Sequence, residues 1–395
     1  MKDFDEGLQI CAVEVFHLKK DLKSEMRISR GGFKVREHAL VQLHTRSGLV
    51  GLGEGIGNAS QISKVLSSFV AHKALEFSAN EMSRWKQTWS YEPTYFEQLG
   101  TVSAAVSAVE MAMWDIYGKA LNRPCYELFG GAARKSLPAY ASDIYWQDDI
   151  DAMRREAHRI RSLGYSKIKA HLGVLPPREE SLRVKAIRDE IGSDADLMID
   201  LNCGYDLRAA KEAIGRWAEH RLYWLEEPLQ PEYNFALAEL MSGAQGIPIA
   251  LGENSFSPAD FSHLASLGAI DVLMPDVGRV GGISTLRDIA AVGKSFGRLV
   301  SPHNFSSGVL LAATAHAICG SYSMDLIEID TSGNAVYEEL LESGWTISGG
   351  TIQISEAPGL GVVLQASTLE RHCIKSERID NHEKGSNTYW TRVPG

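Results

Sequence analysis

The sequence predicts a small α+β segment followed by a closed barrel of parallel strands and helices. From about residue 138 onward, short apolar runs alternate with amphipathic helical stretches, a pattern typical of parallel strands joined by crossover helices. Polar residues follow these runs at intervals of about 25 residues, which is roughly one strand–helix unit. A barrel of such units places the ends of its strands on one rim, where its chemistry is found.

Composition and charge exclude several classes of protein. The chain has 395 residues, of which 44% are hydrophobic and 23% are charged, as in ordinary soluble globular proteins. Its net charge of −10 argues against nucleic-acid binding, which requires a basic face. The start MKDFDEGLQ lacks a secretory pattern, no apolar run approaches membrane length, and the scattered cysteines form no CxxC pair. We therefore expect a cytoplasmic protein with reduced thiols and with neither a nucleic-acid nor a membrane partner.

The first part of the chain has the pattern of an α+β unit. HALVQLHT and LVGLGEG alternate around the turn RSG and predict a β-hairpin. From about residue 61 to 130 the pattern becomes helical, as in SAAVSAVEMAMWDIYGKAL, and Pro124 follows as a stop signal. This segment therefore combines strands with a long helix.

The second part contains eight apolar runs that we interpret as strands: LPAYAS, SKIKA, LMIDL, LYWLEE, IPIAL, DVLMP, RLVSP and DLIEID. Between them lie helical patterns such as DIDAMRREAHRIRSLG and STLRDIAAVGKSFG. Eight units in about 190 residues fit a closed barrel better than an open sheet. Near the end, GTIQIS and GLGVVL are predicted strands that return to the first domain, and residues from about 368 onward are predicted to form a polar surface tail.

Several charged residues interrupt the predicted barrel strands. Such strands are buried on both sides, so a charge within them is costly unless it is paired or bound to metal. Lys167 and Lys169 lie two apart and share one face, and Asp200 and Asn202 are likewise two apart. We expect these side chains to serve chemistry at the rim.

Three carboxylates, on Asp200, Glu226 and Glu253, end the third, fourth and fifth predicted strands. Carboxylates held that close repel one another unless a cation lies among them. Oxygen ligands without Cys or His favour Mg²⁺, with Mn²⁺ as the next choice. Glu227 competes with Glu226 for the ligand position, and strand parity alone does not decide between them.

Candidate bases lie on the other strand ends. Lys169, beside a cation and a second lysine, could have a lowered pKa and accept a proton. Asp276 and His303 end the sixth and seventh strands and predict a carboxylate–imidazole pair. Glu328, on the eighth strand, is predicted to face the metal as an acid or hydrogen-bond donor. His171 shares the parity of Lys169 but lies past the strand end, so a role in the site and a place in a loop both remain open.

These parts predict a reaction class. A divalent cation can bind a substrate carboxylate and hold the enediolate that forms when the α-proton leaves. A Lys or His base combined with one or two Mg²⁺ ions is the pattern of enolase-type sites.

The sequence resembles the enolase superfamily, mandelate racemase subgroup, over nearly the whole chain. The motifs that carry the resemblance are AVEMAMWDIYGKALNRPCYELFGG, KIK, DLN, WLEEP, GEN, MPDVGRVGG, SPHN, IEID and PGLGVVL. Each of them is weak alone, but together, in this order and spacing, they are specific. The resemblance implies a modified TIM barrel, (β/α)7β, over residues 136–350. It also implies an α+β capping domain formed by residues 1–135, with residues 351–395 returning to it.

The resemblance also implies roles for the site residues. Asp200, Glu226 and Glu253 are expected to bind Mg²⁺, which decides for Glu226 over Glu227. Lys169, supported by Lys167, is expected to be one base and the His303–Asp276 dyad the other. The muconate-lactonising subgroup has a lysine in place of Asp276, so that subgroup is disfavoured.

The substrate is expected to be a small carboxylate. The subgroup includes mandelate racemase, acid-sugar dehydratases and sugar-lactone cycloisomerases. SPHNFSSG favours the sugar-acid enzymes, so we expect dehydration of an aldonate or aldarate to a 2-keto-3-deoxy acid. Racemisation or epimerisation of a 2-hydroxy acid and lactone cycloisomerisation are the alternatives. A non-catalytic binding protein is disfavoured, because no ligand position is broken.

Specificity in this subgroup comes largely from loops of the capping domain. The segment KSEMRISRGGFKVRE carries Arg27, Arg30, Lys34 and Arg36 and is predicted to be a mobile basic lid that binds substrate. Asn202 and Asn304 are further predicted substrate-binding residues. We also expect a homo-oligomer, from a dimer to an octamer.

Overall fold

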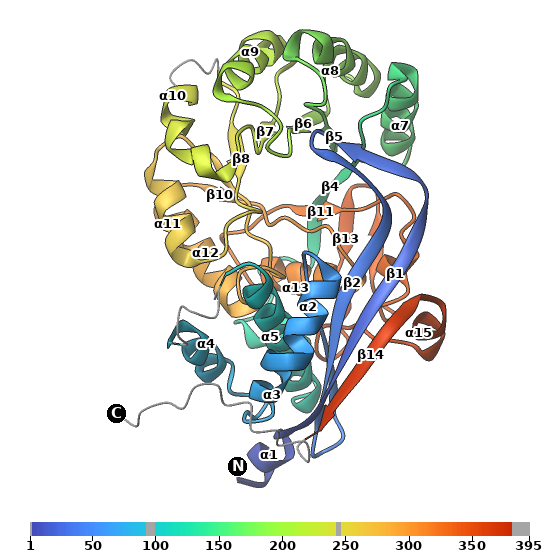
Figure 1. Cartoon of the computed structure of the whole chain (residues 1–395), viewed down its shortest axis with the longest axis vertical. Helices are drawn as coiled ribbons and strands as arrows, with labels where there is room; N and C mark the ends of the chain where they lie inside the picture. Colours follow the sequence, from blue (N-terminus) through green and yellow to red (C-terminus); the bar gives the residue numbers. More distant parts are fainter. Residues whose placement is uncertain (1, 92–98, 242–245, 381–395) are drawn as a thin grey trace.

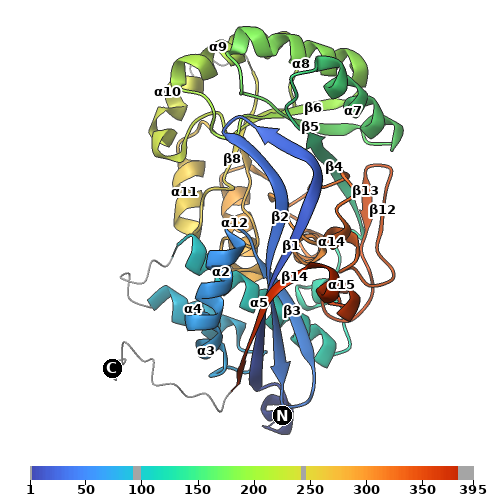
Figure 2. The same ribbon diagram turned by 45° about the vertical axis from the view of Figure 1, so that its right-hand side comes forward.

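The computed structural model describes residues 2–91, 99–241 and 246–380. These residues form a barrel of parallel strands surrounded by helices, and a second unit in which helices pack on an antiparallel sheet (Figure 1). The long β1–β2 hairpin of this second unit, the capping domain, reaches over the barrel (Figure 2).

The capping domain has a four-stranded sheet in the order β14-β1-β2-β3. Its strands are β1 Ile10–Ile28, β2 Gly31–Thr45, β3 Val50–Gly55 and β14 Cys373–Asp380. Its helices are α1 Lys2–Gly7, α2 Ala59–Val65, the π-helical turn η1 Leu66–Val70, α3 Ala71–Ala74, α4 Met82–Tyr91, α5 Thr101–Ala120 and α6 Cys125–Leu128. The hairpin predicted for HALVQLHT and LVGLGEG is confirmed as β2 and β3, and the helical region after residue 61 is confirmed.

The predicted lid segment KSEMRISRGGFKVRE is not a loop. It forms the end of the β1–β2 hairpin, with a two-residue turn at 29–30 and Ile28 paired with Gly31. Met26, Arg27 and Ile28 pair with Phe33, Gly32 and Gly31, and after an irregularity the pairing resumes at Asp21 and Val35. Backbone groups that a free loop would expose to water are therefore bonded across much of the hairpin. The basic residues therefore lie on a hairpin with a defined register.

The barrel contains all eight predicted strands. They are β4 Ser136–Ile144, β5 Lys167–His171, β6 Asp196–Asp200, β7 Trp224–Glu226, β8 Ile249–Leu251, β9 Val272–Leu273, β10 Leu299–Val300 and β11 Ile327–Ile329. Each strand from β4 to β10 pairs in parallel with the next, and β11 pairs in parallel with β4. Between β10 and β11 the Ser301 hydroxyl donates to the Leu326 carbonyl at 3.4 Å. The modified TIM barrel under an α+β cap is thus confirmed.

Helices cover the outside of the barrel (Figure 1). They are α7 Ile150–Ser162, α8 Pro177–Ile191, α9 Leu207–Trp217 followed by the turn η3 Ala218–His220, η4 Pro231–Ala236 with α10 Leu237–Met241, α11 Pro258–Ser266, α12 Ile283–Ser295, α13 Gly308–Cys319 and α14 Ala335–Glu338. Inside the barrel a separate apolar cluster that includes Tyr140, Met198, Trp224 and Val272 fills the lower interior. The polar strand ends lie above this packed layer, at the carboxyl rim.

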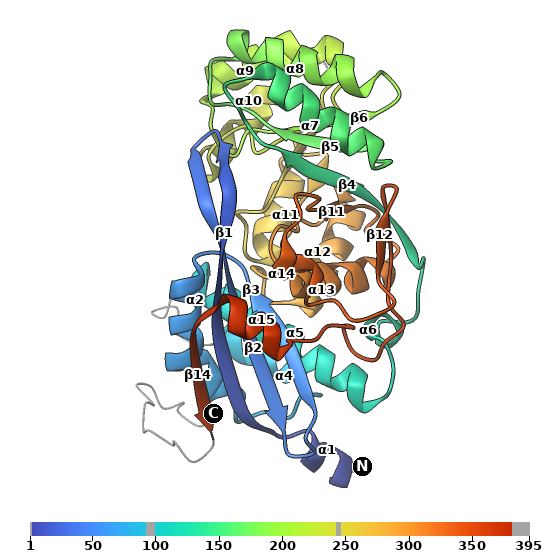
Figure 3. The same cartoon turned by 90° about the vertical axis from the view of Figure 1, so that its right-hand side faces the viewer.

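The C-terminal segment returns to the capping sheet through β14, which pairs with β1, but the two strands predicted within it differ from the prediction. GTIQIS contributes β13 Thr351–Gln353, which with β12 Thr346–Ser348 extends the barrel sheet at β4 and does not join the cap. GLGVVL forms no strand, because Gly359 and Gly361 have φ of 78° and 63°, far from extended backbone. The polar tail from residue 368 is instead the end of α15 Ala366–His372 and the strand β14 (Figure 3). An edge strand can be mostly exposed and polar, because it contributes backbone hydrogen bonds more than side-chain burial. The end of the predicted tail, 381–395, lies outside the described residues.

One buried histidine of the barrel is expected to make the stability of the folded protein depend on pH. His316 is fully buried in α13, accepts a hydrogen bond from the Tyr126 amide and contacts the Leu360 carbonyl, and burial lowers its pKa from 6.5 to about 4. Between pH 6.5 and 4 this histidine is protonated in the unfolded chain but neutral in the native state. The free energy of unfolding therefore falls as the pH drops through this range. The expected loss from this group is about 3 kcal/mol.

This loss can be measured by urea unfolding at several pH values. The variant His316→Gln, which keeps a donor for the Leu360 carbonyl, should be less stable at pH 7 but should show a shallower decline towards pH 4. Equal slopes for the variant and the unchanged protein would contradict the prediction.

Candidate active site

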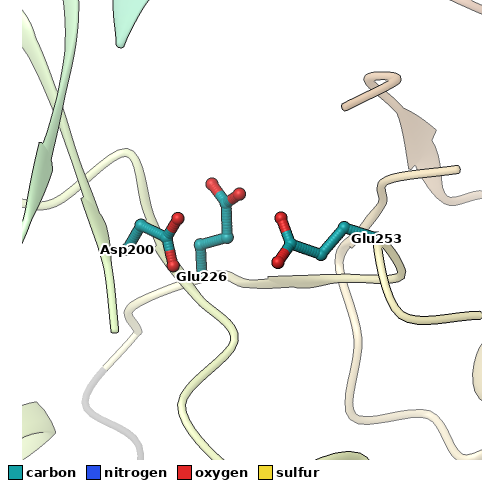
Figure 4. A group of neighbouring side chains, drawn as sticks. All are labelled: Asp200, Glu226 and Glu253. Atoms are coloured by element: carbon teal, nitrogen blue, oxygen red, sulfur yellow. The ribbon is translucent and has the colours of Figure 1, made fainter. Parts of the chain in front are cut away.

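Three carboxylates meet at the rim of the barrel. Asp200 and Glu226 are the last residues of β6 and β7, and Glu253 follows β8 by two positions. One oxygen from each lies within 4.8 Å of the others (Figure 4). Asp200 and Glu226 are buried, and burial together with neighbouring negative charge raises the pKa of Glu226 well above its ordinary value. Burial is also the main cause that raises the pKa of Glu253.

This carboxylate triad fits a hard divalent cation. All its donors are oxygens, they come from three consecutive strands, and bringing them together without positive charge is unfavourable. The group could therefore hold a metal ion.

Glu227 is not a member of this triad, whose clustered oxygens belong to Asp200, Glu226 and Glu253. The backbone of Glu227 has a φ of 43°. Its carboxylate accepts hydrogen bonds from the Gly252 amide at 3.0 Å and from the Cys203 thiol at 3.1 Å. Burial and the nearby Glu253 raise the pKa of Glu227 to about 7. Glu226 is therefore the member of this pair that faces the other two carboxylates.

Lys169 lies beneath the triad and is almost fully buried. Its Nζ is 2.8 Å from oxygens of both Glu226 and Glu328, and 3.8 Å from Asp200. Burial alone would lower its pKa, but the charges of Glu226 and Glu328 raise it well above the ordinary value. The lowered pKa expected for Lys169 assumed a cation and a second lysine beside it. Lys167 does not lie beside it, and for the cation-bound site the lowered pKa stays a prediction.

The structure does not bring Lys167 to the triad. Lys167 begins β5, where its Nζ pairs with Asp196 at the start of β6 and lies 4.5 Å from the centre of the Tyr223 ring. Lys167 and Lys169 share a face, but two residues span about 6.6 Å along a strand, which places Lys167 near the opposite end of the barrel.

The predicted dyad is formed at the Glu253 side of the triad. Asp276 and His303 form a parallel bridge just past β9 and β10, and His303 Nδ1 is 2.6 Å from Asp276 Oδ2. The other ring nitrogen, Nε2, is 3.3 Å from Glu253. Burial opposes protonation, but Glu253 and the hydrogen bond with Asp276 raise the pKa of His303 to about 10.

A second imidazole, on His171, lies at the Asp200 side of the triad. His171 ends β5 in register with Asp200, at 3.4 Å between Nδ1 and Oδ2, and its ring stacks on Tyr145 at 4.8 Å. The sequence left the role of His171 open. The spacing along the strand indicates a place in the site, because Lys169 and His171 are two apart and share a face, and His171 is nearer the rim.

Three further predicted residues are bonded within the site. Glu328 accepts hydrogen bonds from Lys169 and from the Asn304 amide, and although burial opposes ionisation, Lys169 and His303 lower its pKa to about 2. Its role as an acid or hydrogen-bond donor stays a prediction. Asn304 is fully buried and donates to the Glu328 carbonyl. Asn202 donates to Asp200 and contacts His171. Both asparagine side chains therefore orient neighbouring residues.

The hairpin arginines are placed around the rim of the barrel. Arg27 pairs with Asp148 at 2.8 Å and stacks on Trp146, and the Trp146 amide donates to its carbonyl. Arg30 is exposed at the turn. Arg36 is buried, pairs with Asp330 at the end of β11 and lies 4.1 Å from the centre of the Phe305 ring. Arg36 is therefore the most enclosed arginine of this hairpin.

The fold and the site together define a barrel protein with an acidic, metal-type centre between two histidines. Comparison with known families is consistent with this class. Residues 10–130 match the mandelate racemase/muconate lactonizing enzyme N-terminal domain, and residues 152–368 match the enolase C-terminal domain-like family. The chain belongs to the enolase superfamily, in its mandelate racemase subgroup.

Individual relatives resemble the chain over nearly its full length. It is 30% identical to a D-galactarolactone cycloisomerase of Agrobacterium fabrum over 92% of this chain and 98% of that protein. It is 28% identical to an arabinonate dehydratase of Saccharolobus solfataricus over 86% and 91% of the two chains. A solved racemase structure from Streptomyces coelicolor with bound magnesium superposes with a TM-score of 0.84 at 25% identity, covering 92% of this chain and all of that one.

In the part of the chain that the structure describes, no helix is both long and apolar enough to cross a membrane. The cytoplasmic location and the homo-oligomer stay predictions.

Proposed function

We propose that this protein is a magnesium-dependent enzyme that removes the α-proton of a sugar acid and eliminates the 3-hydroxyl, giving a 2-keto-3-deoxy acid. The observation that carries the proposal is the pair of imidazoles on either side of the triad: His303 contacts Glu253, and His171 contacts Asp200. Proton abstraction beside a carboxylate needs such a base close to the bound acid. The similarity to an arabinonate dehydratase supports a sugar acid as substrate.

Asp200, Glu226 and Glu253 would hold the cation. When bound, a divalent cation there would supply positive charge for the substrate carboxylate and for the charge that develops as the α-proton leaves. The buried ammonium of Lys169 adds positive charge beneath the same carboxylates. Glu328, which accepts the Asn304 amide, holds the position of Lys169 from the β11 side.

The two histidines would move the protons. We assign the second base to His171 in place of Lys169, because Lys169 is bonded to two carboxylates below the rim and His171 is level with Asp200. One imidazole takes the proton from the α-carbon. The protonated His303, held by Asp276, delivers a proton to the departing 3-hydroxyl, which leaves as water, and the resulting enol becomes the keto acid.

Cycloisomerisation of a sugar lactone is the second candidate. It is favoured by the 30% identity to a galactarolactone cycloisomerase, which extends over 98% of that protein. Both reactions begin with the same proton abstraction, and they differ in the group that leaves.

A panel of aldonates, aldarates and their lactones, incubated with Mg²⁺ in D₂O, tests the proposal. We expect loss of the α-proton signal and formation of a 2-keto acid with at least one acid, and loss of both in EDTA. Consumption of a lactone without keto acid would favour the cycloisomerase, α-exchange without keto acid would favour racemisation, and no exchange with any compound would refute the proposal.

A further inference from the structure

Two glutamates of the capping domain are buried where this domain meets the barrel, and neither has a role in the proposed reaction. Glu54 lies in β3 and Glu110 in α5, and both are fully buried. A carboxylate is rarely buried unless hydrogen bonds satisfy it, so the partners of these two groups indicate what they do.

Glu54 binds the start of barrel helix α13. One oxygen accepts the Ser307 hydroxyl at 2.5 Å and the amides of Ser307 and Leu310 at 3.3 and 3.2 Å. The other accepts the Ser306 hydroxyl at 2.6 Å and contacts His38 at 3.0 Å. Burial would raise the pKa of Glu54, but these hydrogen bonds lower it, so the carboxylate is ionised at a helix N-terminus.

Glu110 binds the start of barrel helix α12 in the same way. One oxygen accepts the Ile283 amide at 2.7 Å, and the other accepts the amide and hydroxyl of Ser284 at 3.0 and 2.5 Å. The N-cap residue of α12 is Gly282, which has no side chain to cap the helix. A β-carbon at Gly282 would lie 2.2 Å from the Glu110 carboxylate, so this carboxylate occupies the position of the missing cap.

The two capped helices are those that follow the dyad. Asp276 precedes α12 by a short loop, and His303 precedes α13 by another. The capping domain holds the first loop at two more points: Ser107 of α5 accepts the Gly281 amide at 2.8 Å, and the Ile56 amide donates to the Gly278 carbonyl at 3.2 Å. Gly278 in turn donates its amide to Asp276 at 2.7 Å.

β3 and α5 are themselves locked together. A β-carbon at Gly51, Gly53 or Gly55 would lie 2.6 Å or less from a backbone carbonyl oxygen of α5, so the strand lies directly on the helix. Successive strand residues point to opposite faces, and Glu54 therefore projects away from α5. The result is one rigid unit that presents two carboxylates to the barrel.

We propose that Glu54 and Glu110 are positioning residues, through which the capping domain sets the distance and orientation of the His303–Asp276 dyad. The proposal rests on the proposed function for its catalytic consequence, but its structural part concerns the dyad alone. A base displaced by about 1 Å can lose about a hundred-fold in rate. The capping domain would then determine the geometry of one base as well as enclose the substrate.

The test is a spectroscopic readout of the dyad in the full-length, Mg²⁺-loaded protein. The short His303–Asp276 hydrogen bond should give a far-downfield proton resonance, assigned by its loss in His303→Asn. Glu54→Met and Glu110→Met, which keep length and remove the acceptors, should each shift or abolish this resonance. If the methionine variants do not fold, Ser306→Ala and Ser284→Ala each remove one hydroxyl hydrogen bond to Glu54 or Glu110 and should produce smaller shifts.

Glu180→Met is the matched control. Glu180 is also a fully buried glutamate that accepts loop amides, those of Gly173 at 3.2 Å and Leu175 at 3.0 Å, but this loop follows His171. Its replacement should leave the His303 resonance unchanged. With an acid that the unchanged protein converts, the Glu54 and Glu110 variants should slow α-proton exchange at the His303 face about a hundred-fold. They should slow α-proton exchange at the His171 face less than about two-fold.

An unchanged His303 resonance in all four Glu54, Glu110, Ser306 and Ser284 variants would overturn the positioning role. An equal shift in Glu180→Met would also overturn it, because it would show a general response to the loss of any buried carboxylate. Failure of the proposed function looks different: the unchanged protein then exchanges no α-proton, while the resonance still reports on the dyad.

Discussion

Replacing His303 with asparagine is expected to stop proton exchange at one face of the substrate α-carbon and to preserve exchange at the other. Asparagine is similar in size and can still donate to Asp276, but it cannot carry a proton near neutral pH. General acid–base groups contribute about 10²- to 10⁴-fold to rate, so turnover to product should fall within that range. Proton NMR in D₂O on both epimers of the acid measures each face separately.

The reciprocal variant His171→Asn should show the opposite preference. His171 and His303 lie at different ends of the triad, beside Asp200 and Glu253, so each should serve one face. His44→Asn is a suitable control, because His44 is paired with Glu14 on the capping sheet. Loss of exchange at both faces in either variant would point to a single base. Unchanged exchange in both would remove the histidines from the mechanism.

The sequence predicted those parts of the fold and site that depend on strand ends. Eight apolar runs indicated the barrel strands, and polar residues after three of them, Asp200, Glu226 and Glu253, indicated the triad. Both predictions use local patterns, because a parallel barrel places every strand end on one rim whatever its detailed packing. Asp276 and His303 could be paired for the same reason, since their strands are neighbours.

The sequence did not predict the register of a residue relative to the neighbouring strand, or which distant segments pair with each other. Parity placed Lys167, Lys169 and His171 on one face, but only the ladder with β6 shows that His171 is level with Asp200. The lysine pKa depended on Glu226 and Glu328, which are far away in sequence. The β14 edge strand was also missed, because a mostly exposed edge strand shows no apolar alternation.

Replacing Lys169 with methionine is expected to cause a large loss of stability in the metal-free protein. The ammonium lies between Glu226 and Glu328, all three groups are buried, and methionine has a similar length without the charge. Removing one partner of a buried ion pair leaves an uncompensated charge and costs about 3–5 kcal/mol. Urea unfolding at pH 7 in EDTA measures this cost.

Lys167→Met provides the matched control on the same strand. Lys167 pairs with Asp196, and both side chains are partly exposed, so its loss should cost less than about 1 kcal/mol. Added Mg²⁺ should recover part of the stability lost in Lys169→Met, because a cation among Asp200, Glu226 and Glu253 offsets the same excess of negative charge. Equal losses in the two variants would show that the buried carboxylates do not depend on Lys169. A deficit that Mg²⁺ leaves unchanged would show that the triad and the lysine are electrostatically independent.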